Sequence, residues 1–154
     1  MRKFFAVILV MMLVVPAAAE DAFVKQISIG RDGSGMTWYL TDYGIDNNTY
    51  YAVARKYYTS AAVKNDTIER LISRNRVPEK KANTLYLTEY RYEYTSDGKQ
   101  YAEIYRVHYD MQGREIYRID FDNSTSARRK HYINVVKNSI MSKGYAYASG
   151  RLKK

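Results

Sequence analysis

Segments in which apolar and polar residues alternate predict six β-strands. Each segment is rich in Tyr, Ile, Val or Thr, which favour the half-buried surface of a sheet. Turn residues such as Gly, Asp and Asn separate them, so consecutive strands are expected to pair antiparallel as a meander. The predicted strands are residues 23–29, 36–41, 49–58, 84–95, 100–109 and 115–121.

An insert at residues 61–83 carries the pattern of a short helix. Asp66 is expected to be its N-cap, because Glu69 three residues later completes a capping box. Pro78 prevents the helix from continuing far. The apolar stripe of this helix consists of Ile68, Leu71 and Ile72.

A longer amphipathic helix is predicted near the C-terminus, from about residue 126 to residue 143. Gly144 is placed to end it, since glycine is common just after the last turn of a helix. This helix is expected to pack its apolar face on the sheet. That face consists of Tyr132, Ile133, Val136 and Ile140.

The dipeptide Asp97-Gly98 sets the expected register of the fourth and fifth strands. We expect a two-residue type I′ loop with positive φ at both residues, in which Ser96 faces Lys99. Counting outward from this turn pairs Tyr94 with Tyr101, Tyr92 with Glu103, Tyr90 with Tyr105, Thr88 with Val107 and Tyr86 with Tyr109.

The same register places Arg106 and His108 on the opposite, polar face of the sheet. For the next turn we expect a three-residue loop with Gly113 in the left-handed conformation, because this loop keeps apolar residues on the tyrosine face. It sets Tyr117 opposite Val107 and Ile119 opposite Tyr105.

These elements predict a single α+β domain over residues 20–154. The expected architecture is an antiparallel meander of about six strands, with the C-terminal helix on one face and the short helix inserted mid-chain. Most of the 17 tyrosines are therefore predicted to lie in the core, with hydroxyl groups reaching its rim.

The N-terminal residues predict a secretory signal peptide, residues 1–19. Arg2 and Lys3 precede an apolar run too short to span a bilayer as a stable helix, and Ala17 and Ala19 suit cleavage after Ala19. An uncleaved anchor is the alternative. No cysteine follows the run and no second apolar run of spanning length occurs. We expect an exported protein, periplasmic or at the cell surface, that is not a lipoprotein and has no transmembrane segment after cleavage.

The net positive charge of the chain limits the classes of binding partner that we expect. The chain has 25 Lys and Arg against 16 Asp and Glu, a formal net charge of +9, and loss of Arg2 and Lys3 with the signal peptide lowers it to +7. Such a balance favours anionic partners. For an exported protein we expect an acidic glycan, a lipid head group or an acidic protein surface, and not nucleic acid. The absence of cysteine excludes disulfides and thiol catalysis.

The sharpest candidate binding site is the basic run Arg128, Arg129 and Lys130 at the start of the predicted long helix. Basic side chains oppose the helix dipole there, so they could hold an anion together with the first helical N–H groups. The alternative is local pairing with Asp120 or Asp122, or simple solvation.

A second basic group lies in and after the short helix, and a third forms the C-terminal tail. Either could steer an acidic partner, although solubility alone would explain the tail. The second group comprises Arg70, Arg74, Arg76, Lys80 and Lys81, and the tail comprises Arg151, Lys153 and Lys154.

The sequence contains no recognisable set of catalytic residues. His108 and His131 are the two histidines, and neither has a carboxylate and a nucleophile at a spacing typical of a known reaction. His108 and Asp110 could form a weak acid–base pair, although Asp110 is better placed to start its turn. A hydrolase that uses His108 stays an alternative, but we expect no enzyme activity, no catalytic residue, no cofactor and no metal site.

Two stretches carry a resemblance to a known family: residues 30–58, GRDGSGMTWYLTDYGIDNNTYYAVARKYY, and residues 90–121, YRYEYTSDGKQYAEIYRVHYDMQGREIYRIDF. With the closing amphipathic helix, they resemble the surface-adhesin protein E family, small exported proteins of diderm bacteria. The matching features are the Gly-containing turn before Trp38, the strand after Thr49 and the turn that ends at Gly113.

The resemblance implies an antiparallel sheet packed on a C-terminal helix. It also implies adhesion to host matrix and plasma proteins such as vitronectin, laminin and plasminogen. The chain departs from the family in two ways. It lacks the cysteine pair with which many relatives pin the terminal helix, and the insert at residues 61–83 matches no family feature.

We therefore expect a non-catalytic exported binding protein, adhesin-like, that recognises host proteins or anionic ligands. The alternative is a periplasmic envelope-maintenance or structural protein that binds another envelope component or an anionic polymer. An edge strand could also pair two copies into a homodimer or accept a partner strand.

Overall fold

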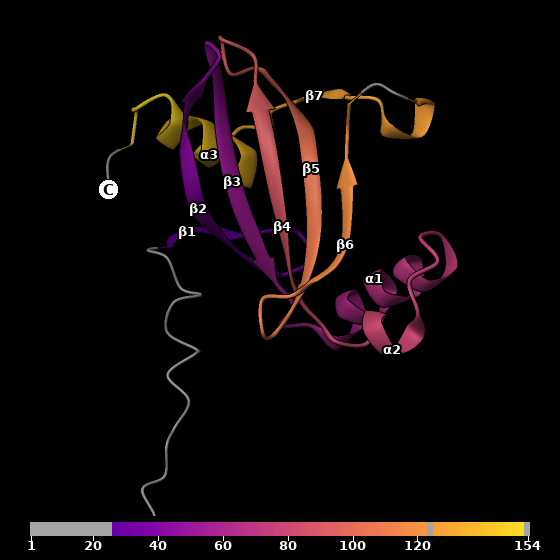
Figure 1. Cartoon of the computed structure of the whole chain (residues 1–154). Coiled ribbons are helices and arrows are strands. Elements are labelled where there is room, and N and C mark those ends of the chain that lie inside the picture. The colour runs from indigo at the N-terminus through magenta and orange to yellow at the C-terminus, as the bar shows by residue number, and fades with distance from the viewer. Residues whose placement is uncertain (1–25, 123–124, 153–154) are drawn as a thin grey trace, which may run out of the picture.

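The computed structural model describes residues 26–122 and 125–152. The predicted signal peptide, residues 1–19, lies outside these residues. So do residues 23–25 of the first predicted strand, and Lys153 and Lys154 of the basic tail. Figure 1 shows a single curled sheet with helices near both ends of its strands.

The predicted antiparallel meander is confirmed. Strands pair in chain order from β1 to β6, all antiparallel, and the sheet curls into a half-barrel. A short strand that was not predicted, β7, pairs with the beginning of β5. The strands are β1 (Ile27–Arg31), β2 (Thr37–Asp46), β3 (Thr49–Tyr57), β4 (Leu85–Tyr94), β5 (Gln100–Asp110), β6 (Glu115–Asp120) and β7 (Tyr132–Asn134).

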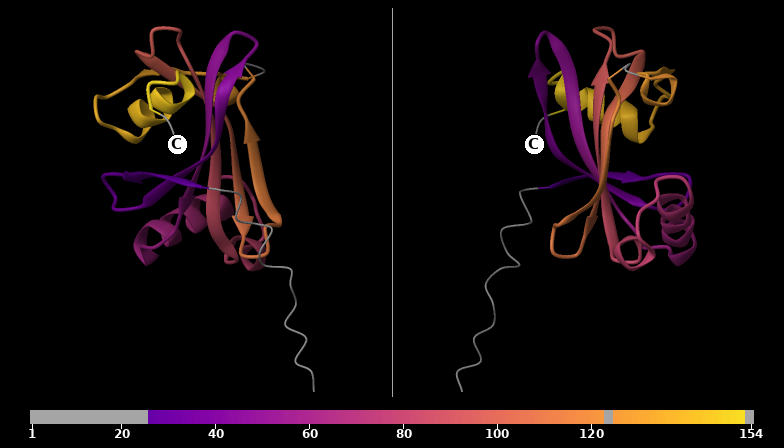
Figure 2. Two further views of the ribbon diagram at one scale, coloured as in Figure 1. Left: turned by 90° about the vertical axis from the view of Figure 1, so that its left-hand side faces the viewer. Right: turned by 45° about the vertical axis from the view of Figure 1, so that its right-hand side comes forward.

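The two views of Figure 2 show α3 near one end of the strands and α1 with α2 near the other. Both helical groups meet the concave face, because the buried Tyr90 packs in the cluster under α3 and also borders a cavity lined by α1. No helix in the described part of the chain is long and apolar enough to cross a membrane. The helices are α1 (Ala61–Ser73), α2 (Glu79–Ala82) and α3 (Ile140–Ala148).

The α3 helix is fixed by close contacts with β3, β4 and the hairpin turn after β4. The Tyr145 hydroxyl donates a hydrogen bond to the Ser96 carbonyl at 2.9 Å, and its ring meets the Tyr50 ring edge-on at 5.4 Å. Gly144 faces Tyr94 so closely that a Cβ atom there would lie 2.5 Å from the Tyr94 hydroxyl oxygen. The buried residues of this cluster are Ile29, Trp38, Leu40, Ala52, Ala54, Tyr90, Tyr92, Tyr94, Ile140 and Tyr145.

The other end of the strands has a smaller core under α1 and α2. Ser60 caps α1 by accepting a hydrogen bond from the Val63 N–H. The predicted N-cap, Asp66, is wrong: the alanine-rich first turn starts the helix earlier, and Asp66 lies inside it in an ion pair with Arg70. The buried residues of this cluster are Leu71, Val77, Ala82, Leu85 and Ile116.

The prediction of one long helix over residues 126–143 is wrong in its bounds. The segment holds a single 3-10 turn, Ser126–Arg128, then β7, and α3 begins only at Ile140. The β-branched and aromatic residues after Lys130 favour an extended chain, and Asn138 takes a positive φ of 61° just before α3. Gly144 therefore lies inside the helix and does not end it. Three residues of the predicted apolar face are exposed: Tyr132, Ile133 and Val136.

The first hairpin turn also differs from prediction. Gly98 has a positive φ of 69°, but Asp97 is not among the positive-φ residues, so the loop is not type I′. Thr95 and Gln100 close a longer loop through a 3.0 Å backbone hydrogen bond. The pairing of Tyr94 with Tyr101, and that of Tyr92 with Glu103, is nevertheless confirmed.

Farther from the turn, a bulge shifts the register by one residue. Arg91 pairs with Tyr105 whereas Tyr92 pairs with Glu103, so Ile104 is an extra residue in β5. Every β5 side chain after it changes face relative to the prediction. Tyr105 and Tyr109 consequently leave the predicted core for the convex face, where they are half-buried, and Tyr90 lies opposite Arg106.

A second bulge, at Ile116, follows the next turn. The predicted three-residue loop with a left-handed Gly113 is confirmed, since its φ is 75° and the Asp110 N–H donates to the Arg114 carbonyl. The extra residue places Tyr117 opposite His108 and Ile119 opposite Arg106.

The close approach of α3 to β4 generates a stability prediction. Gly144→Ala should destabilise the protein by about 1–2 kcal/mol, because the clash with the Tyr94 hydroxyl outweighs the gain of roughly 1 kcal/mol in helix propensity. In a Tyr94→Phe background the same change should be neutral or stabilising. A urea-denaturation double-mutant cycle measures this coupling, and additive effects of the two changes would contradict it.

Candidate functional site

The bulge at Ile104 turns two basic residues toward the concave face. Arg106 now lies opposite Tyr90, and His108 lies opposite Thr88. Because Thr88 pairs in turn with Lys56 of β3, these cross-strand neighbours project from the same face of the sheet. The middle of the concave face is therefore basic and polar, between the two apolar clusters.

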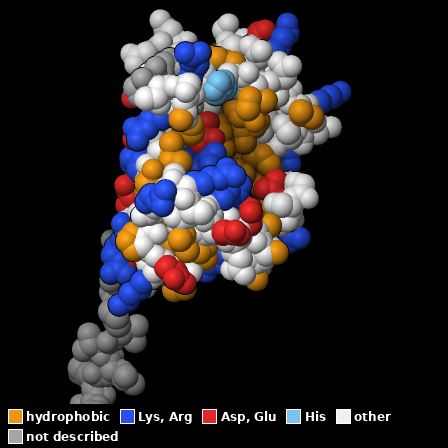
Figure 3. All heavy atoms as spheres, turned by 90° about the vertical axis from the view of Figure 1, so that its right-hand side faces the viewer, with side chains coloured by type: hydrophobic (Ala, Val, Ile, Leu, Met, Phe, Trp, Pro, Cys, Tyr) orange, Lys and Arg blue, Asp and Glu red, His pale blue; other side chains and the backbone are white. Residues whose placement is uncertain are grey.

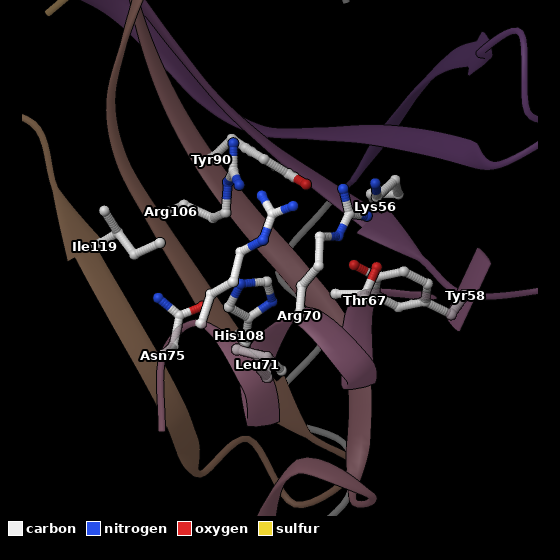
Figure 4. A pocket seen from close by; sticks show the side chains of 11 residues that line it. Lys56, Tyr58, Thr67, Arg70, Leu71, Asn75, Tyr90, Arg106, His108 and Ile119 are labelled. Carbon is white, nitrogen blue, oxygen red and sulfur yellow. The ribbon is translucent and has the colours of Figure 1, made fainter. Parts of the chain in front are cut away.

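A cavity of about 410 Å³ opens over this part of the sheet, with α1 forming its other wall. Figure 4 shows Lys56, Arg70 and Arg106 directed toward a common space, with the Tyr90 hydroxyl pointing toward the basic side chains. The lining residues are Lys56, Tyr58, Thr67, Arg70, Leu71, Arg74, Asn75, Tyr90, Arg106, His108 and Ile119. Four of these are Lys or Arg, and none is Asp or Glu.

Lys56 is one of two cavity cations without an ion pair to a described carboxylate. Its ammonium lies 5.5 Å from the ring centre of Trp38, 5.3 Å from that of Tyr58 and 5.7 Å from that of Tyr90. Within the described residues no carboxylate lies at ion-pair distance from it. The rings offset part of the cost of burying the charge, but they supply no counter-charge.

The surroundings of Lys56 lower its pKa. Burial is the main cause, and repulsion from Arg106 and Arg70 adds to it. Attraction to Asp32 and Glu103 opposes the shift but does not cancel it. An anion in the cavity would reverse this balance, since it would favour the charged form of Lys56.

Two of the cavity's arginines do have carboxylate partners. Arg106 makes a bidentate ion pair with Glu103, at 2.8 Å and 2.9 Å, which the bulge permits by bringing both onto one face. Arg70 pairs with Asp66 one turn earlier on α1. Arg74 has no ion pair with any described carboxylate. These pairs leave Lys56 and Arg74 as an excess of two positive charges.

His108 is buried at the inner end of the cavity. Its Nδ1 shares a hydrogen bond of 2.9 Å with the Thr88 hydroxyl, which lies 2.8 Å from the Tyr58 hydroxyl. Burial lowers the pKa of His108 to about 3, and repulsion from Arg106, Lys56 and Arg70 contributes. The imidazole is therefore neutral near pH 7, where it can accept or donate one hydrogen bond at each nitrogen without adding charge.

Figure 3 shows the face of the molecule that lies on the right-hand side in Figure 1. Lys and Arg side chains gather in the middle of the face in Figure 3, beside a hollow lined by apolar side chains. Because Arg70 and Arg74 line the cavity and are exposed, the cavity presents positive charge to solvent and can attract anions from a distance of about a Debye length.

The structure separates the binding residues expected from the sequence. Arg70 and Arg74 line the cavity, whereas the other three residues of their group, Arg76, Lys80 and Lys81, are exposed on the turn after α1 and on α2. The predicted helix start at Arg128, Arg129 and Lys130 is wrong, and anion binding by these residues stays a prediction. These residues end a 3-10 turn and lead into β7, so no long helix presents N–H groups there, and Lys130 contacts Glu93.

Sequence reasoning missed three central residues of the cavity: Lys56, Arg106 and His108. Strict alternation along β5 placed the last two on the convex face. A warning was present in the pattern, because Glu103 fell among the tyrosines while Ile104 fell on the polar face. An exchange of polar and apolar parity within one strand is typical of a bulge.

The described residues include no group of three or more His, Asp or Glu side chains that could hold a metal ion. The chain matches no protein-family model, and comparisons with curated proteins and with solved structures find no match. The function of the cavity must therefore be argued from its own geometry.

The depressed pKa of His108 predicts how stability depends on pH. The unfolded chain binds a proton at His108 near pH 6.5, whereas the folded state resists protonation until about pH 3. The contribution of His108 to the free energy of unfolding should therefore be fully present above pH 6.5. It should fall by roughly 1.4 kcal/mol per pH unit as the pH drops from 6 to 4. Urea denaturation across this range measures the slope.

His108→Asn should flatten that slope, because the Asn amide can keep the bond to Thr88 and does not titrate. The matched control is His131→Asn, which changes an exposed histidine and should leave the slope of the wild type. An equal slope in the His108 variant and the wild type would show that another group causes the acid instability.

Proposed function

We propose that the protein is an exported, non-catalytic binding protein that holds an anionic ligand in the basic cavity of its concave face. The observation that carries this proposal is the composition of the lining. Four basic side chains from β3, α1 and β5 converge on the cavity, no carboxylate lines it, and two of the four charges have no ion-pair partner among the described residues.

The cavity cations that have no ion pair with a described carboxylate favour a ligand-binding role for the cavity over a purely structural one. A structural cluster of this kind would gain stability by losing Lys56, since burying an unpaired charge costs free energy. An anion at the site would supply the missing counter-charge and stabilise the folded state through its binding energy. The cavity also falls within the range of ligand pockets, roughly 300–1,000 Å³.

A binding role fits the cavity better than a hydrolase that uses His108. General acid–base catalysis needs a group that changes protonation near the working pH. The His108 pKa of about 3 keeps the ring neutral and weakly basic. Asp110, its proposed partner, instead accepts hydrogen bonds from the backbone N–H groups of Gln112 and Arg114 in its own turn.

The exported location rests on the predicted signal peptide, and adhesion to host proteins rests on the resemblance to the surface-adhesin protein E family. The cavity supports the anionic-ligand form of this function, in which the recognised group is acidic whether it belongs to a host molecule or to the envelope. Protease treatment of intact cells separates the two settings: a cleaved domain supports surface adhesion, and a protected one supports the envelope alternative.

Anion binding predicts a specific stabilisation of the folded protein. In thermal unfolding, inorganic phosphate should raise the Tm of the wild type above the value in sodium chloride of equal ionic strength. A ligand present at 100 times its Kd contributes about 2.7 kcal/mol, which corresponds to several degrees for a domain of this size.

Lys56→Met should remove most of this phosphate effect, because it takes away a half-buried charge that has no ion pair with a described carboxylate while keeping the length of the side chain. Lys137→Met is the matched control: Lys137 is exposed on the segment between β7 and α3 and does not line the cavity. The proposal fails if phosphate acts no differently from chloride, or if both variants respond to phosphate as the wild type does.

A further inference from the structure

We infer that the ligand of the basic cavity is a phosphate monoester, a doubly charged phosphoryl group carried on a small polar organic moiety. This inference rests on the proposed function, since it names the chemical class of the anion bound at the same site. Charge balance, the arrangement of donors and the size of the cavity support it.

Charge balance sets the number of negative charges. The lining contains Lys56, Arg70, Arg74 and Arg106, and the last of these is neutralised by its bidentate pair with Glu103. Arg70 is neutralised by an acidic neighbour on its own helix. Two cations are left over, so a dianion compensates the cavity fully and a monoanion leaves it with excess charge.

Among common biological anions, a terminal phosphate monoester has the required charge. It carries between −1.5 and −2 at pH 7, because its second pKa is about 6. A carboxylate, a sulfate ester or a phosphodiester carries a single charge, so it should gain less from the cavity field.

The donors around the cavity suit a group with several terminal oxygens. Lys56 projects from β3, Arg70 from α1, Arg74 from the C-cap of α1, and Arg106 from β5. A planar carboxylate can accept from one or two such directions, whereas a tetrahedral phosphoryl group presents three terminal oxygens to different walls. Arginine also matches phosphate oxygens with two parallel N–H donors.

Size and the remaining polar groups argue for an organic moiety. The cavity of about 410 Å³ exceeds the volume of a single phosphate ion and has room for a group the size of one sugar ring. The Asn75 side chain makes no hydrogen bond to another described residue, and the Tyr90 hydroxyl makes none either. These polar groups border the cavity and can bond to hydroxyl groups of a ligand.

Isothermal calorimetry with one sugar scaffold tests the inference. Glucose 6-phosphate, glucose 6-sulfate and glucuronate share their polar ring and differ in charge. We expect glucose 6-phosphate to bind the wild type at least about tenfold more tightly than either monoanion at pH 7.5. This preference should shrink at pH 5, where the phosphate becomes mainly a monoanion while His108 stays neutral in the ligand-free protein.

Two variants test whether the uncompensated cations set the preference. Lys56→Met and Arg74→Gln each lower the excess charge by one, so each should reduce the ratio of phosphate to sulfate affinity by at least about threefold. Lys137→Met removes an exposed charge outside the cavity and should leave the ratio unchanged. Arg74 is exposed, so its replacement keeps the test informative even if Lys56→Met alters the packing around β3.

Binding of the protein to lipid vesicles tests whether the phosphoryl group belongs to a lipid. Phosphatidic acid displays a phosphate monoester and phosphatidylglycerol a phosphodiester, in otherwise matched phosphatidylcholine vesicles. Selective binding to phosphatidic acid vesicles without binding of glucose 6-phosphate keeps the phosphate monoester but overturns the small polar moiety, and assigns the site to a lipid head group. Binding of glucose 6-phosphate without any vesicle binding assigns it to a soluble or polymer-borne sugar phosphate.

The outcomes separate the inference from the proposed function. If the three sugars bind with equal affinity, or a monoanion binds best, the phosphate monoester is ruled out while anion binding stands. If none of them binds, and phosphate fails to stabilise the protein, the proposed function itself is overturned.

Discussion

The central strands are longer than the helices can cover, and the rest of the structure depends on this mismatch. β3, β4 and β5 have 9 to 11 residues, or roughly 30–36 Å, whereas a helix that crosses a sheet covers about 10 Å of it. α3 crosses β1, β2 and β3 at one end, and α1 packs at the other. The middle of the concave face is left open, so its side chains face a cavity.

The middle of the concave face carries basic side chains, which are unusual in a protein interior. Each end of the sheet has an apolar cluster that the helices seal, but between them the strands carry Lys56, Arg106 and His108, with Tyr90 beneath them. Aromatic rings and the carboxylate of Glu103 reduce the electrostatic cost without removing it. Burial and the neighbouring positive charges lower the pKa of His108, so the ring stays neutral, and they lower the pKa of Lys56 as well. The folded protein therefore keeps a positive field in the cavity.

The sequence predicted the meander, the inserted helix and the presence of a C-terminal helix, because alternation and turn residues act locally. It could not place the bulges at Ile104 and Ile116, since both look like ordinary strand residues and their effect depends on the neighbouring strand. One extra residue moved Arg106 and His108 to the concave face and Tyr105 away from it. The C-terminal helix is shorter than the sequence predicts for a similar reason: β7 forms because Gln100–Ala102 offers it a free edge.

The central claim is that the fold tolerates an uncompensated charge at Lys56 for the sake of an anionic ligand. The most direct measurement is the free energy of unfolding of Lys56→Met and of the wild type in dilute chloride buffer without phosphate. The account predicts that the ligand-free variant is more stable, by about 1 kcal/mol, because an apolar side chain replaces a half-buried charge that Arg106 and Arg70 repel. The Lys137→Met control should differ from the wild type by less than about 0.5 kcal/mol. A Lys56→Met protein less stable than the wild type would contradict the account, because it would make Lys56 a structural residue.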